Sequence, residues 1–171
     1  MTLFSRSLVR RICIASACLC FTAFAFALPP ASGDVILTIS GKIKEVNRDA
    51  TAVFDLDMLQ KLPQQTFTTK TPWDKNPTKF TGPLLRDVLN AVKAEGKTLT
   101  AYALNDYKTT IPAEDAQLFD VIIAHRIDDM PISVRTKGPL FIIYPFDSKP
   151  ELKSSKYYGR SAWQLKSLKI D

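Results

Sequence analysis

The fold is decided by the stretch Arg135–Pro145, which reads Arg-Thr-Lys-Gly-Pro-Leu-Phe-Ile-Ile-Tyr-Pro. Its second half, Leu140–Tyr144, is an unbroken apolar run between turn residues, which is typical of a buried strand. Arg135 and Lys137 precede the turn, so a rigid strand would carry two cations at its mouth, suited to a polar or anionic ligand. The alternative is a core strand preceded by two solvated charges.

Short strands are predicted along most of the remaining chain. Their β propensity and alternation place them at residues 35–40, 43–54, 66–71, 99–104, 107–111, 121–124, 132–134 and 161–170. Apolar residues recur at helical spacing between Gly82-Pro83 and Gly96, which predicts a helix there. Short helical turns are expected after Asp57 and Pro112, and Ser148–Gly159 is predicted to be a polar surface loop. The pattern favours an α+β fold with a mixed or antiparallel sheet and few helices.

The first 27 residues have the composition of an export signal. Three arginines precede an apolar stretch that ends in Ala25-Phe26-Ala27, which predicts a secretory signal peptide cleaved after Ala27. An uncleaved membrane anchor is the alternative, but the apolar stretch is short for a span. The expected organisation is therefore a signal peptide over residues 1–27 and a single domain over residues 28–171, located in the periplasm.

Composition excludes several classes of function. The net charge of +6 includes the three leader arginines, and no basic tract follows them, so nucleic-acid binding is not expected. All three cysteines lie in the leader, so residues 28–171 have no disulfide, thiolate metal site or cysteine nucleophile. His125 is the only histidine. Its position next to Arg126 suggests a catalytic residue, but a histidine at the end of a strand is the simpler interpretation.

The order of several short motifs resembles the molybdopterin-binding fold of sulfite oxidase and its bacterial relatives. These motifs are Phe80–Leu89, Asn105–Tyr107 with Ile111-Pro112, Met130-Pro131, Lys137–Leu140 with Tyr144-Pro145, and Trp163–Leu165. The resemblance extends from about Leu37 to Ile170. It implies a molybdopterin-binding fold over nearly the whole of residues 28–171.

One departure from the family changes the expected function. Catalytic members hold molybdenum through a cysteine thiolate, which residues 28–171 do not have. The chain therefore looks like the small secreted members thought to bind pterins as receptors, without molybdenum or another metal. Such members resemble periplasmic partners of inner-membrane proteins that make or degrade cyclic di-GMP. The alternatives are a molybdopterin-dependent oxidoreductase with a non-cysteine metal ligand, and a remnant of the fold that binds only protein.

A pterin ring needs a hydrogen-bonding partner and a surface for stacking. Its adjacent donors suit a carboxylate, so Asp106 is predicted to bind them, flanked by Asn105 and Tyr107, unless Asn105-Asp106 is an ordinary turn. Trp73 lies in a proline-bounded loop, where its indole would stack on the ring or anchor the loop to the core.

The other predicted ligand-binding residues would complete the polar and aromatic walls. Arg135 and Lys137 would donate to ring acceptors, while Tyr107 and Tyr144 would each lend a hydroxyl or be a core ring with a satisfied O–H. Trp163 is more simply explained as core, and Ser161 as a turn residue.

Overall fold

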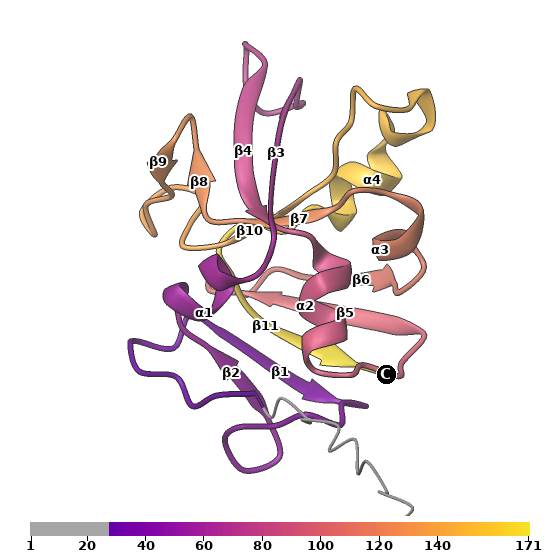
Figure 1. The fold of residues 1–171 in the computed structure, drawn as a ribbon. Coiled ribbons are helices and arrows are strands. Elements are labelled where there is room, and N and C mark those ends of the chain that lie inside the picture. Colours follow the sequence, from indigo (N-terminus) through magenta and orange to yellow (C-terminus); the bar gives the residue numbers. More distant parts are fainter. Residues whose placement is uncertain (1–27) are drawn as a thin grey trace, which may run out of the picture.

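Five strands pair into the largest sheet of this computed structural model, which describes residues 28–171 (Figure 1). The order across the sheet is β2 (Ala52–Phe54), β1 (Leu37–Gly41), β11 (Leu165–Ile170), β5 (Thr98–Ala103) and β6 (Lys108–Pro112). β1 and β11 are parallel, and the other neighbours are antiparallel. The α+β class with a mixed sheet is thus confirmed. The predicted signal peptide, Met1–Ala27, lies outside the described residues.

A second sheet is entirely antiparallel. It contains β3 (Gln64–Thr69), β4 (Thr78–Pro83), β8 (Arg126–Ile127) and β9 (Met130–Pro131). The hairpin of β3 and β4 projects from the molecule at the top of Figure 1. Between the two sheets, β7 (Ile122–Ala124) and β10 (Phe141–Ile143) form an antiparallel pair.

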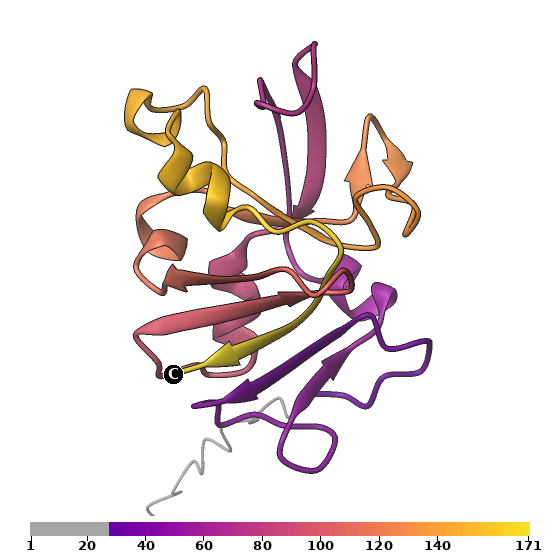
Figure 2. The same ribbon diagram turned by 180° about the vertical axis from the view of Figure 1, so that it is seen from behind.

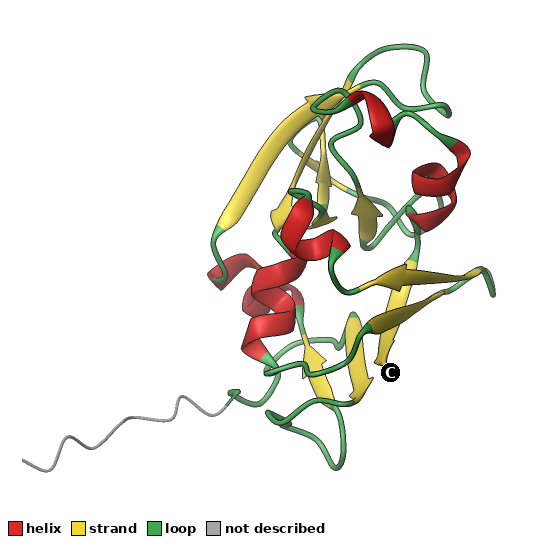
Figure 3. Ribbon diagram, turned by 90° about the vertical axis from the view of Figure 1, so that its right-hand side faces the viewer, coloured by secondary structure: helices red, strands yellow, loops and turns green. Residues whose placement is uncertain are grey.

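The helices are short. They are α1 (Leu56–Lys61), α2 (Leu85–Ala91), α3 (Asp115–Leu118) and α4 (Ser155–Arg160), with a 3-10 turn η1 (Pro150–Leu152). Figures 1 and 2 show α2 on one face of the five-stranded sheet. Figure 3 shows the helices in red and the strands in yellow from the side. Within residues 28–171, every helix is too short to cross a bilayer.

The predicted strand at Leu140–Tyr144 is confirmed as the centre of the core. β10 occupies its middle, and each residue from Leu140 to Phe146 is buried. Gly138 explains how the chain enters this strand, because a Cβ there would overlap the Ile132 carbonyl oxygen. The glycine therefore lets two backbone segments approach closely.

The predicted helix at Gly82–Gly96 is shorter than expected. Thr78–Pro83 forms β4, and a Cβ at Gly82 would overlap the Ile123 carbonyl oxygen of β7. The Gly-Pro pair therefore ends a strand instead of starting a helix, and α2 spans Leu85–Ala91.

The cap of α1 also differs from the prediction. Asp55, not Asp57, is the N-cap, and its Oδ1 accepts the Met58 N–H at 2.8 Å. Its Oδ2 accepts the N–H groups of Gly33 and Ser32, both at 2.8 Å. The backbone donors, first Gly33 and then Met58, hold the pKa of Asp55 below its ordinary value despite burial.

The prediction of a surface loop at Ser148–Gly159 is wrong. This segment contains η1 and most of α4, and it buries Leu152 and Tyr157 against the core. Its polar composition hid these two anchors, which are spaced too irregularly to show a helical face. The segment is thus part of the packed structure.

Candidate functional site

A cavity of about 290 Å³ lies where four segments that are distant in sequence meet. The β3–β4 loop, the β5–β6 turn, the end of α4 and the segment leading into β11 each contribute to its wall. The lining residues are Trp73, Asn105, Tyr107, Tyr158, Gly159, Ser161 and Trp163. The volume is near the lower end for ligand pockets, which suits a ring system better than a large molecule.

Two indoles dominate the apolar wall. The Trp73 and Trp163 ring centroids are 5.4 Å apart at 80°, an edge-to-face arrangement. Tyr158 meets Trp73 edge-on as well, at 6.1 Å and 70°. A third ring could be sandwiched between these two indoles only if they were parallel and about 7 Å apart. A flat ligand would therefore lie on the face of one indole and against the edge of the other.

The opposite wall is polar and ties α4 to the β5–β6 hairpin. The Tyr107 hydroxyl donates to the Gly159 carbonyl at 2.6 Å, and Thr109 Oγ1 donates to the same oxygen at 2.8 Å. The Asn105 side-chain oxygen accepts the Tyr107 N–H at 3.2 Å. The Tyr107 hydroxyl hydrogen is already donated to the Gly159 carbonyl. Tyr107 therefore helps to fix the shape of the cavity.

Ser161 forms the end of α4. Its N–H donates to the carbonyls of Tyr157 and Tyr158, and its hydroxyl donates to the Tyr157 carbonyl at 3.1 Å. The side chain is buried and satisfied within the helix end. Ser161 therefore shapes the wall, in keeping with its interpretation as a turn residue.

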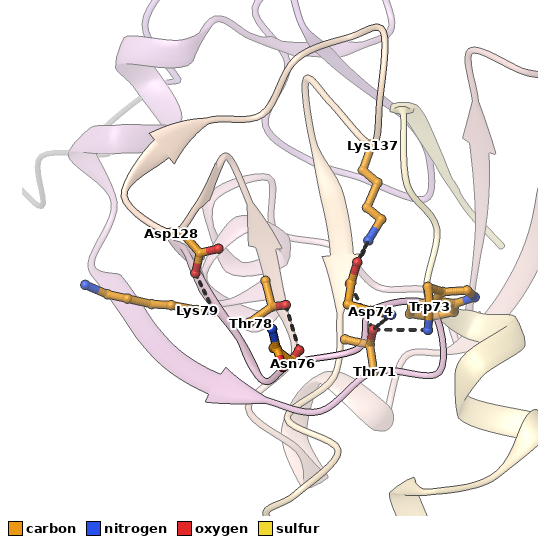
Figure 4. Close-up of polar contacts among 8 residues, drawn as sticks. All are labelled: Thr71, Trp73, Asp74, Asn76, Thr78, Lys79, Asp128 and Lys137. Carbon is orange, nitrogen blue, oxygen red and sulfur yellow. Dashed lines mark hydrogen bonds and ion pairs between the residues drawn. The ribbon is translucent and has the colours of Figure 1, made fainter.

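The loop that carries Trp73 is held by a network of polar contacts (Figure 4). Thr71 Oγ1 accepts the N–H groups of Trp73 and Asp74 at 3.2 and 3.1 Å, and it donates to the Asp74 carboxylate at 2.9 Å. Lys137 Nζ contacts both oxygens of Asp74 at 2.7 Å. These contacts fix the indole before any ligand arrives.

The start of the same loop is anchored by Asp147. Its carboxylate accepts the Lys70 N–H at 2.6 Å and pairs with Lys153 at 2.8 Å. The bond from Lys153 is the main reason why the pKa of Asp147 lies below its ordinary value. The loop is therefore tied to the segment that leads into η1.

The structure brings five of the nine predicted site residues into the cavity and places four outside it. Asp106 is exposed at the β5–β6 turn and has φ 65°, a conformation in which Asn and Asp are favoured. Asp106 is therefore an ordinary turn residue. Arg135 is exposed in a turn, and Lys137 is engaged by Asp74.

Tyr144, the fourth, belongs to the core. Its hydroxyl donates to Asp115 Oδ2 at 2.7 Å, and Arg160 donates to the same oxygen at 2.7 Å. Burial, then the bond to the Asp115 carboxylate, raises the pKa of Tyr144. This network ties the end of α4 to the start of α3 and to the residue that follows β10.

His125 has a structural partner. Its ring is buried, and Nε2 lies 2.9 Å from Gln64 Oε1. Burial, assisted by the nearby charge of Arg126, lowers the pKa of His125, so the ring is neutral at pH 7. The residue fits the interpretation as a strand-end histidine.

Most of the chain matches a known protein family. Residues 30–148 match the family model described as oxidoreductase molybdopterin binding domain. The chain belongs to this family. The resemblance to the sulfite oxidase fold is thereby confirmed. A search of curated proteins gives no match.

The cavity fits one part of the cofactor that the molybdopterin binding domain family implies. Its indoles and amide suit an organic ring, but the lining includes no thiolate, imidazole or carboxylate. Residues 28–171 also contain no group of three or more metal-ligating side chains. The lining therefore fits a pterin ring, and it does not offer the soft ligand that molybdenum takes in this family.

Sequence reasoning missed Tyr158 and Gly159, which complete the wall of this cavity. The Tyr157-Tyr158 pair was the available signal, since two adjacent aromatics in a polar stretch suggest one buried and one lining ring. The family match ends at residue 148, so α4 and Trp163 lie beyond it.

Proposed function

We propose that this chain is a periplasmic receptor that binds a pterin without molybdenum and reports its binding to an inner-membrane signalling protein. The edge-to-face pair of Trp73 and Trp163 in a ring-sized cavity is the observation that supports pterin binding most strongly. Family membership supports the same ligand class.

Stacking supplies most of the affinity in this proposal. A base-like ring on an aromatic side chain gains about 1–3 kcal/mol. The Trp73 loop is fixed by Thr71 and Asp74, so little ordering is needed when the ligand binds. Together with a few hydrogen bonds, this predicts binding with Kd on the order of micromolar.

Asn105 supplies the polar recognition. Its side-chain oxygen is used by Tyr107, and among the described residues its NH2 group has no protein acceptor. That group is available for a ring nitrogen or carbonyl of the ligand. Asn105 therefore replaces Asp106 as the residue proposed to read the edge of the pterin.

The signalling role rests on export and on the family resemblance. The predicted signal peptide would deliver the domain to the periplasm, where an inner-membrane protein that makes or degrades cyclic di-GMP would sense it. Because Ser148–Gly159 builds part of the cavity wall and packs against the core, deleting this segment should abolish ligand binding.

The test uses protein purified from its own periplasm. The sample is denatured, released small molecules are examined for pterin fluorescence, and molybdenum is assayed on the same sample. Pterin without stoichiometric molybdenum supports the receptor. Molybdenum at near-equal stoichiometry would establish the oxidoreductase instead, and neither would favour a protein-binding remnant.

A matched pair of variants tests the assigned residues. Asn105→Ala should weaken pterin binding by about fivefold through loss of a hydrogen bond, while its neighbour Asp106→Ala should leave affinity unchanged. Fluorescence titration with a soluble pterin measures both. The opposite ranking would return the role to Asp106.

A further inference from the structure

The outer edge of β3 is an unpaired strand edge. Among the described strands β4 is its only neighbour, and Figure 1 shows the hairpin projecting from the body of the molecule. Residues 64–69 read Gln-Gln-Thr-Phe-Thr-Thr, with no charge and no proline. Natural sheets usually block such edges with charge, proline or a bulge, so an open edge of this length points to a partner.

Backbone directions show which groups the edge presents. The Thr81 and Lys79 carbonyls of β4 accept N–H groups from His125 and Asp128, on the side away from β3. Their partners across the β3–β4 ladder are Thr66 and Thr68. In an antiparallel pair, residues opposite such positions direct their own N–H and C=O groups outward. Gln64, Thr66 and Thr68 therefore offer three donor–acceptor pairs at the free edge.

A polar hollow lies beside this edge. It has a volume of about 380 Å³, and its lining includes Gln64 and Thr66 of β3, Thr81 of β4, and His125 with Arg126. Side chains of an added strand alternate between faces, so every second one would lie over this hollow. The lining also includes the Asp129 carboxylate, which is paired with Lys79, beside the permanent cation of Arg126, so the hollow favours polar, uncharged side chains.

The charges that flank the edge select the occupant. Lys61 ends α1 before the strand, Lys70 follows the strand, and both are exposed. Neither has an ion-pair partner within residues 28–171. A second copy paired antiparallel about Thr66 would bring Lys61 toward Lys70 of the other copy, which is unfavourable.

The geometry points to an extended, uncharged segment of another protein, flanked by acidic residues, that adds to β3 as a new strand. This inference names the docking surface for the partner of the proposed receptor, and in that sense it rests on the proposed function. The loop that follows β3 carries Trp73, so the docked strand would lie next to an element of the ligand cavity.

The test measures peptide binding to the cleaved protein. The probe is the peptide Glu-Glu-Thr-Val-Thr-Val-Thr-Glu-Glu, compared with a twin carrying lysines in place of the glutamates. We expect the acidic probe to bind at least about tenfold tighter at low salt, with amide shifts and slowed hydrogen exchange at Gln64, Thr66 and Thr68. Equal binding of both peptides, or none, overturns the proposal.

Two variants make the result specific. Lys61→Glu with Lys70→Glu should reverse the preference between the two peptides, because it changes only exposed charges. Thr66→Pro should abolish binding of the acidic probe, because it removes an outward N–H that β4 does not use. A dimer in light scattering that Thr66→Pro dissociates would assign the edge to a second copy and overturn the proposal.

Pterin titration of the same samples separates this inference from the proposed function. Thr66→Pro should bind pterin like the wild type, since Thr66 lies outside the cavity. If the wild type selects the acidic peptide but binds no pterin, the receptor proposal fails and the docking edge stands. The reverse result removes only the docking edge.

Discussion

Two carboxylates, Asp115 and Asp74, make ion pairs of the same length in different surroundings. Asp115 lies 2.7 Å from Arg160, with side-chain exposures of 4% and 17% in that order, and it also accepts the Tyr144 hydroxyl. Asp74 lies 2.7 Å from Lys137, with exposures of 29% and 23%. Distance alone would rank the two pairs equally. Burial makes their expected contributions to stability differ, because removing one partner of a buried pair leaves the other charge with neither a partner nor water to solvate it.

The largest effect is expected from the buried pair. Asp115→Ala should lower the free energy of unfolding by about 3–5 kcal/mol, because Arg160 and the Tyr144 hydroxyl lose their shared acceptor. Urea denaturation measures it, with Asp120→Ala, whose pair with Arg86 is more exposed, as the control. A loss below about 1 kcal/mol would show that the buried network is dispensable and would remove the contrast.

The cavity is tested through ligand binding, although Trp73 also packs against Phe141 and Phe146, so its alanine variant should lose stability as well. Trp73→Ala should weaken pterin binding by about tenfold or more, since one stacking surface is lost, and any ligand-dependent tryptophan signal from it should disappear. Trp73→Phe should restore part of the affinity if stacking is the cause. Unchanged affinity in the alanine variant would remove Trp73 from the binding site.

A third carboxylate, Asp55, sharpens the comparison because its partners are backbone N–H groups. Asp55→Ala should cost about 1 kcal/mol at neutral pH through loss of the α1 cap. Its pKa is lowered in the folded state, so this contribution is complete above about pH 4 and is lost as the pH falls through the folded pKa. Wild type and variant should thus converge in stability in acid. A constant difference would mean that the carboxylate charge is not involved.

The smallest stability effect is expected at the more exposed pair of Lys137 and Asp74. Lys137→Ala should change the free energy of unfolding by about 0–1 kcal/mol, because Asp74 keeps access to water and the Thr71 hydroxyl. Thermal denaturation with and without added salt measures it. A loss as large as that of Asp115→Ala would show that exposure does not separate the two pairs.

The sequence predicts those parts of the fold whose signal is local. The apolar run at Leu140–Tyr144 specifies a buried strand by itself, and the helix at Leu85–Ala91 shows its apolar spacing. β4 was missed because Gly82-Pro83 also matches a helix start, and only the approach of the Ile123 carbonyl shows why glycine is needed there. η1 and α4 were missed because their anchors, Leu152 of η1 and Tyr157 of α4, are held by contacts distant in sequence.

The candidate site was predictable in residue type more than in position. Trp73 stood out because an indole in a proline-bounded loop is unusual, whereas Trp163 was more simply explained as core, and the structure places both in one cavity. Asn105 and Asp106 are adjacent and chemically alike, so the sequence could not tell which side chain lines the cavity. That difference depends on the backbone of the turn, where Asp106 has positive φ.

Gly159 gives the cavity wall a property of its own. Its contribution to the fold is a carbonyl oxygen that accepts two hydrogen bonds, and a Cβ added there would meet no heavy atom within 4 Å. Alanine would keep those bonds, and in this helical position it would add about 0.5–1 kcal/mol of stability. The capacity of the cavity can therefore be altered at one codon while folding is kept, which gives natural variation a direct route to new ligand preferences.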